Sequence, residues 1–185
     1  MFFFNKLRPT KVVIPQALKN MLNEYREQQA KAKPQVDACY NVNYDSQVPY
    51  SLAEEPDEDI DKIKEKIKEE KLKDSFNELL FKFIDKKGLD DTSVYKKAFV
   101  DRRLFSKIRS NKDYHPSKGT IIQLALALEL SLDETLELLD AAGHSLPGNT
   151  EKNLVIIYIF ENKYYDVKYA NDLLYSVCGT TFDRL

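Results

Sequence analysis

Five short stretches between residues 75 and 142 repeat apolar side chains every three or four positions, which is the spacing of an amphipathic helix. In the first, Ser75 and Glu78 stand at the distance of a capping box, and Gly88 follows the last apolar residue, as the start and end of a helix favour. The later stretches are each preceded by a residue that can cap a helix: Asp90 or Asp91, Asp101, Ser117 and Ser131. The pattern predicts five helices, of which the fourth spans Thr120 to Leu130 and the last ends near Gly143.

The second and third of these helices are separated by a turn of about three residues that includes Phe99 and Val100. The third helix, from Asp101 to Arg109, has Leu104, Phe105 and Ile108 as its apolar positions and carries its basic residues mainly on another face. Two short helices joined by so short a turn are typical of a helix-turn-helix.

The chain before residue 75 carries a weaker pattern. Pro15 suits the first turn of a helix with Leu18 and Leu22 on its apolar stripe, which would end before Lys33. The preceding residues 11–14 fit either a short strand or a hydrophobic staple.

Residues 34–56 show no sustained period and mix Asn, Asp, Ser and Pro with isolated tyrosines, which is typical of a linker, although a partner-binding peptide is the alternative. Residues 57–74 alternate acids with lysines around Ile60, Ile63 and Ile67. This segment fits a charged helix that docks one edge, or a short coiled coil that would make a homodimer.

Two further helices are predicted after Pro147 and Gly148. Asn149 or Thr150 can cap the first, which is apolar on nearly every face from residue 154 to 160 and must therefore be buried. The second runs from about Asp166 to Cys178. Because only five residues of 185 are glycine, we expect an all-α protein. Its predicted segments are an N-terminal helical segment (1–33), a linker (34–56), a charged helix (57–74), a five-helix domain (75–142) and a two-helix extension (143–185) packed on that domain.

The charge distribution and the candidate chemical groups limit the classes of function that the sequence supports. Because the net charge is −2, overall basicity gives no reason to expect nucleic-acid binding, but residues 95–118 hold eight basic residues against two acidic ones, a local charge of +6. His115 and His144, the two histidines, have no cysteine or second histidine nearby in sequence, and Cys39 and Cys178 lie far apart, so we expect no metal site, no cofactor and no enzyme. With no apolar run of membrane-spanning length and no signal peptide, we expect no membrane association and a cytoplasmic location.

The segment 75–142 resembles the lambda-repressor/Cro, or Xre-like, family of helix-turn-helix domains. Three strings carry the resemblance: Lys86–Lys87–Gly88–Leu89, the run from Val100 to Ile108, and Pro116–Ser117 followed by Leu124–Ala125 and Leu130–Ser131–Leu132–Asp133. The run from Phe105 to Lys112 and the two helices after the domain also resemble, more weakly, a C-terminal module of some bacterial macro-domain proteins. This second resemblance implies an accessory binding role.

The repressor resemblance implies a DNA-binding protein of the bacterial or phage transcriptional-regulator type, whose helix from Asp101 reads the major groove. Carried over by position, the residues that would contact bases or phosphates are Arg102, Arg103, Ser106, Lys107, Arg109, Lys112 and Lys118. Two positions depart from the family. Phe99 stands where the turn usually has glycine, so we expect strain or a remodelled turn, and Leu104 lies near the groove-facing side. Leu104 suits the alternative function, a non-catalytic adaptor that uses the same scaffold to bind another protein.

Overall fold

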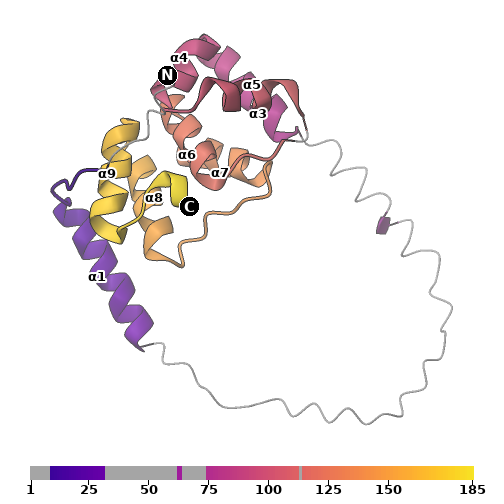
Figure 1. The fold of residues 1–185 in the computed structure, drawn as a ribbon. Helices are drawn as coiled ribbons and strands as arrows, with labels where there is room; N and C mark the ends of the chain where they lie inside the picture. The colour runs from indigo at the N-terminus through magenta and orange to yellow at the C-terminus, as the bar shows by residue number, and fades with distance from the viewer. Residues whose placement is uncertain (1–8, 32–61, 64–73, 113) are drawn as a thin grey trace, which may run out of the picture. The chain divides into compact units, whose positions relative to one another are not determined.

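The computed structural model describes residues 9–31, 62–63, 74–112 and 114–185 (Figure 1). Its elements in chain order are α1 (Gln16–Lys31), α3 (Phe76–Lys87), α4 (Asp91–Lys97), α5 (Arg102–Ser110), α6 (Lys118–Ala127), α7 (Leu132–Asp140), α8 (Glu151–Glu161), α9 (Val167–Cys178) and the 3-10 helix η1 (Phe182–Arg184). No strand occurs among the described residues, so the predicted all-α class is confirmed for this part of the chain.

The described residues fall into two compact units, the first comprising 9–23 and 74–185 without residue 113, the second 24–31 and 62–63. The predicted linker and its partner-binding alternative lie outside the described residues. So does nearly all of the predicted charged helix, including the coiled-coil alternative. Within the described parts, no helix combines the length and the apolar content that crossing a bilayer would need.

Side-chain caps start the helices where the sequence predicts. At α3 the Ser75 hydroxyl accepts the Glu78 backbone N–H at 3.3 Å, and Glu78 Oε2 accepts the Ser75 N–H at 3.2 Å, which is a complete capping box. Ser131 and Glu134 repeat this arrangement at α7. Where the sequence left a choice, the structure selects Asp90 for α4 and Thr150 for α8.

Several helices end in a left-handed residue that closes a Schellman motif. Gly88 does so after α3, but Phe99, Glu129 and Lys163 adopt the same conformation without being glycine, at φ of 55°, 52° and 56°. After α6, the N–H of Glu129 donates to Leu126 O and that of Leu130 to Ala125 O, both at 3.0 Å. This motif is why α6 ends at Ala127 rather than at Leu130 as predicted.

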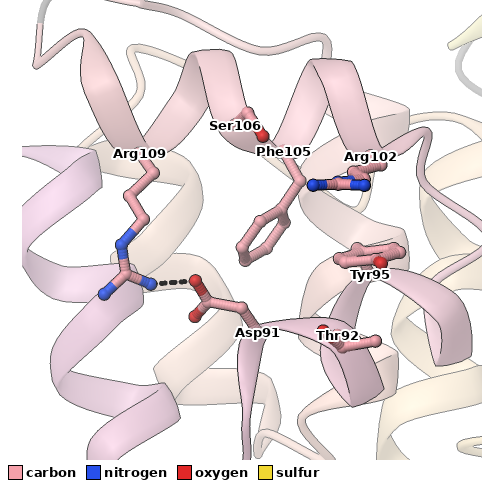
Figure 2. A pocket seen from close by; sticks show the side chains of 7 residues that line it. All are labelled: Asp91, Thr92, Tyr95, Arg102, Phe105, Ser106 and Arg109. Carbon is pink, nitrogen blue, oxygen red and sulfur yellow. Dashed lines mark hydrogen bonds and ion pairs between the residues drawn. The ribbon is translucent and has the colours of Figure 1, made fainter.

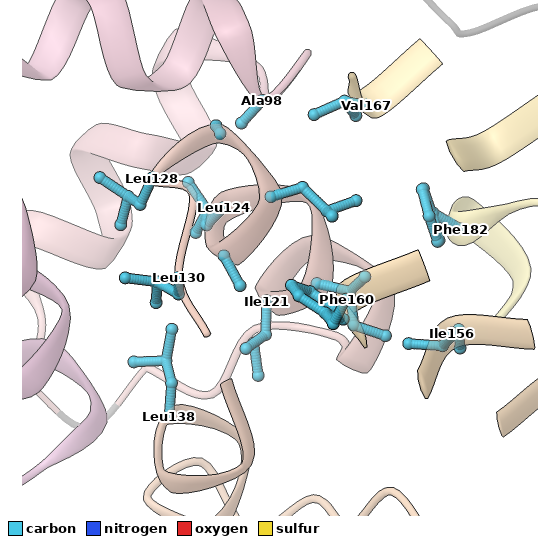
Figure 3. Packing of buried hydrophobic residues seen from close by; sticks show 14 of the residues in the cluster. Ala98, Ile121, Leu124, Leu128, Leu130, Leu138, Ile156, Phe160, Val167 and Phe182 are labelled. Carbon is cyan, nitrogen blue, oxygen red and sulfur yellow. The ribbon is translucent and has the colours of Figure 1, made fainter. Parts of the chain in front are cut away.

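Helix α6 is the centre of the hydrophobic core. Every residue from 121 to 128 is buried, and the helix contacts α4, α7, α9 and η1 (Figure 3). Gly119 in its first turn lies directly against the backbone of Phe182, and an added Cβ atom would stand 1.8 Å from Phe182 O. Phe182 is also held from the other side, where its N–H donates to the buried Asn171 Oδ1 at 3.0 Å.

Helices α8 and α9 pack against each other, with α8 also on α7 and α9 on α6. Val155, Ile156, Ile159 and Phe160 are each at most 2% exposed. The prediction that this almost wholly apolar helix is buried is therefore confirmed.

The segment before α1 attaches to α9 through side chains rather than as a strand. Asp172 accepts the Thr10 N–H at 2.9 Å and the Thr10 hydroxyl at 2.7 Å, and Ser176 Oγ accepts the Val12 N–H at 2.9 Å. Leu18 and Leu22 of α1 are buried in the core cluster. Burial by itself raises the pKa of the Asp172 carboxyl, but the hydrogen bonds from Thr10 and Lys168 outweigh it and leave that pKa below its ordinary value.

Candidate functional site

Helices α4 and α5 present the basic part of the chain. They contact each other across the turn at residues 98–101, and Val94 of α4 with Phe105 and Ile108 of α5 is buried, which fixes one face of each helix to the core. Because Phe105 and Ile108 are buried and Leu104 is half-buried against the core, the polar positions of α5 face solvent. Its exposed residues are Arg102, Arg103, Ser106, Lys107, Arg109 and Ser110.

The turn between the two helices keeps its left-handed residue. Phe99 donates its N–H to Lys96 O at 3.1 Å, and Val100 donates to Tyr95 O at 2.9 Å. The turn is thus closed by an ordinary Schellman motif around a phenylalanine at positive φ, which is a strained conformation for a bulky residue. The strain expected at Phe99 is present, and the side chain remains 36% exposed.

Two basic residues of α5 are held by neighbouring side chains. Arg109 forms an ion pair with Asp91 at the start of α4, and its Cζ lies 4.6 Å from the ring centroid of Phe81. The Lys107 Nζ lies 4.4 Å from the ring centroid of Tyr114. Both contacts orient the charge without removing it from the surface, because both side chains belong to exposed residues.

The last two predicted contact residues bind other helices. Lys112 Nζ donates to Glu78 Oε1 of α3 at 3.1 Å, and this hydrogen bond lowers the pKa of the Glu78 carboxyl. Lys118 Nζ donates to Asn153 Oδ1 of α8 at 2.9 Å, and its partial burial lowers the pKa of its ammonium group. Lys118 therefore joins α6 to α8 rather than extending the exposed face of α5.

A pocket of about 390 Å³ opens between α4 and α5, and we call it the α4–α5 pocket (Figure 2). Its lining residues are Asp91, Thr92, Tyr95, Arg102, Phe105, Ser106 and Arg109. The structure thus brings three of the predicted contact residues, Arg102, Ser106 and Arg109, to one cavity. The α4 residues that share it were not predicted from the sequence, although Tyr95 follows Thr92 by three positions and Asp91 by four, which places it on the same side of a helix as both.

The charge of the α4–α5 pocket is concentrated at Arg102. Asp91 neutralises Arg109, whereas no carboxylate among the described residues forms an ion pair with Arg102. Figure 2 shows the Arg102 guanidinium on the side of the pocket near Tyr95, away from the Asp91–Arg109 pair. The hydroxyl groups of Thr92 and Ser106 add neutral hydrogen-bond donors.

The remaining candidates lie elsewhere. Leu104 is half-buried and packs against the core cluster. His144 Nε2 is 3.0 Å from Pro116 O, and Cys178 is half-buried at the end of α9. Cys39 lies outside the described residues. Within the described ranges, no three His, Cys, Asp or Glu residues are grouped as a metal ion would require.

This arrangement presents cations and hydroxyl donors on one exposed helical face, which is what binding of a phosphate-rich partner would require.

Comparison with known proteins identifies no relative of this chain. No family model matches the chain, and neither a curated protein nor a solved structure matches it.

Proposed function

We propose that this protein binds double-stranded DNA, with α4 and α5 acting as a lambda-repressor-like helix-turn-helix and α5 entering the major groove. The observation that carries the proposal is the exposed face of α5, where Arg102, Arg103 and Lys107 project from a helix that Phe105 and Ile108 anchor in the core. An anchored helix can hold its side chains at a fixed position relative to base edges.

The chemistry of these side chains fits the proposal. An arginine guanidinium donates two parallel hydrogen bonds to the O6 and N7 atoms of guanine, and lysines add attraction to phosphates. The local charge of +6 over residues 95–118, in a chain of net charge −2, would direct this face toward DNA and the rest of the chain away from it.

Fluorescence anisotropy with labelled duplex DNA tests the proposal. We expect binding whose affinity falls steeply between 50 and 200 mM salt, as roughly expected for several phosphate contacts. The Arg102→Ala/Arg103→Ala variant should lose most of it. A matched control is Lys19→Ala/Lys152→Ala, which removes two charges from exposed helical positions outside α5. Absence of binding at low salt, or equal loss in both variants, would refute the proposal.

Quaternary structure provides a second test. Repressor-type domains commonly read two half-sites about 34 Å apart with two copies of the chain. We therefore propose a homodimer on DNA, and sedimentation analysis with and without a duplex should show two copies per DNA. One copy per duplex at saturating protein would contradict paired half-site reading.

A protein-interaction adaptor is the second candidate, and Phe99 favours it. An apolar ring that is 36% exposed at a strained turn is a residue type and position that protein interfaces use. The adaptor proposal expects a protein complex that persists at high salt and is lost in Phe99→Asn, because asparagine tolerates positive φ but removes the ring. A DNA complex that Phe99→Asn leaves intact would favour the first candidate.

A further inference from the structure

The α4–α5 pocket supports a more specific assignment than general attraction to DNA. We propose that it binds a single phosphate group, with the Arg102 guanidinium as the charged donor and the hydroxyls of Thr92 and Ser106 as neutral donors. The assignment of DNA as the source of that phosphate rests on the proposed function. The phosphate chemistry of the pocket itself does not.

The donors converge from two elements. Thr92 lies in the first turn of α4, while Arg102 and Ser106 are separated by four positions and so lie on one side of α5. All three residues line the same pocket, and Figure 2 shows Arg102 and Ser106 on the α5 side, Thr92 on the α4 side and the Phe105 ring between the two helices. Because Phe105 is 3% exposed and packed in the core, this wall of the pocket is fixed.

The charge balance of the lining favours an anion. One acid and two arginines line the pocket, which gives a net charge of +1. The acid, Asp91, is already paired with Arg109, and the Phe81 ring lies against the guanidinium of that pair. The Asp91–Arg109 pair thus acts as a neutral wall, and the charge at Arg102 is available to a ligand.

The donor set suits a phosphate better than a carboxylate. A guanidinium binds two oxygens of an oxyanion in parallel, and hydroxyls on other sides of the pocket would then need further acceptor oxygens. A tetrahedral phosphate offers them in three dimensions, whereas the two oxygens of a carboxylate lie in one plane. The volume of about 390 Å³ leaves room for the group that carries the phosphate.

The proposed phosphate site gives the adjacent residues Arg102 and Arg103 different roles in DNA binding. If Arg102 binds a phosphate, it positions α5 on the DNA backbone, and Arg103 is left to read a base. Arg102→Ala should then weaken binding about equally on every DNA sequence and reduce the salt slope by about 1. Arg103→Ala should instead reduce discrimination between sequences.

The decisive variant keeps the charge and removes the hydroxyls. Thr92→Val/Ser106→Ala should weaken DNA binding by about tenfold while the salt slope stays unchanged, because the lost hydrogen bonds are neutral. The matched control is Ser110→Ala/Ser145→Ala, which removes two exposed hydroxyls that do not line the pocket. Amide NMR spectra of the full chain would establish that each variant is folded.

Titration with inorganic phosphate at constant ionic strength, followed by the same spectra, identifies the source. Phosphate-dependent changes in amide chemical shift at residues 91–95 and 102–109, absent in Thr92→Val/Ser106→Ala (the hydroxyl variant), would support phosphate binding in the pocket. This holds whether or not the protein binds DNA. If DNA binds, normal affinity of the hydroxyl variant together with no phosphate-dependent shift would overturn the pocket while leaving the proposed function intact. Phosphate-dependent shifts without DNA binding would refute the proposed function and assign the pocket to a free phosphate compound. Neither DNA binding nor shifts would refute both.

Discussion

The carbonyl oxygen of Phe182 lies so close to Gly119 that a Cβ atom on Gly119 would come within 1.8 Å of it. This contact joins the first turn of α6, at the centre of the core, to the C-terminal η1. The oxygen belongs to the backbone, and Asn171 holds the N–H of the same residue, so rotation of a side chain cannot relieve a clash.

Gly119→Ala should therefore destabilise the protein. We expect a loss of about 1–3 kcal/mol in the free energy of unfolding, the usual cost of overpacking a core. Urea unfolding monitored by circular dichroism measures it. Gly148→Ala is the control, because the nearest atom to its Cβ would be 3.7 Å away, at ordinary contact distance. Equal midpoints for both variants would show that η1 shifts without cost.

The Asp172 carboxylate should make stability depend on pH. Its pKa is lower in the folded chain than the ordinary aspartate value of about 3.9. The stabilisation is hence complete above that value and is lost as the pH falls through the folded pKa. Thermal unfolding between roughly pH 7 and pH 2 should show Asp172→Asn to be less stable at neutral pH and to lose less stability in acid than the wild type.

The exposed Asp140→Asn serves as the comparison for that experiment, since Asp140 lies at the end of α7 and its side chain is not buried. Parallel pH profiles for the wild type and Asp172→Asn would mean that the Thr10–Asp172 attachment contributes no proton-linked stability.

Lys163 offers a direct measure of strain at a left-handed residue. Its side chain is exposed at φ of 56°, so Lys163→Gly removes the steric cost of this conformation. We expect a net gain of about 0.5–1 kcal/mol, because the steric relief of about 1–2 kcal/mol is partly offset by the greater freedom of glycine in the unfolded chain. Lys163→Val should lower stability at the same position, as measured by the urea midpoint. A lower midpoint for the glycine variant would contradict this account.

Helix starts could be predicted from the sequence because capping is local. Ser75 with Glu78, and Ser131 with Glu134, contain within four residues the groups that form the hydrogen bonds. The ends of helices were harder to predict from the sequence. The apolar period continues to Leu130, which is buried, although the helix stops at Ala127. Periodicity reports burial, and here burial extends past the helix.

The candidate site was predictable in part for the same reason. Helical spacing places Arg102, Arg103 and Ser106 away from the buried positions of α5, and they are exposed. The α4–α5 pocket could not be derived, because it depends on the packing of two helices. Nor could the Thr10–Asp172 hydrogen bonds, which join residues 162 positions apart.

The ion pair between Asp91 and Arg109 yields the last prediction, which concerns DNA affinity. Asp91 is the one acid that lines the α4–α5 pocket, and on DNA it would face phosphates of like charge. Asp91→Asn keeps the size of the side chain, raises the charge of the lining from +1 to +2, and leaves Arg109 free to contact phosphate. We expect DNA affinity to rise by about three- to tenfold at low salt, with a salt slope steeper by about 1, as one added phosphate contact implies.

Anisotropy titrations at several salt concentrations measure both the affinity and the salt slope. The control is Asp133→Asn, which makes the same change in net charge at an exposed acid in the first turn of α7, outside the pocket. If the two variants bind alike, the effect comes from net charge alone; if Asp91→Asn binds more weakly than the wild type, the ion pair instead holds α5 in the orientation that binding needs.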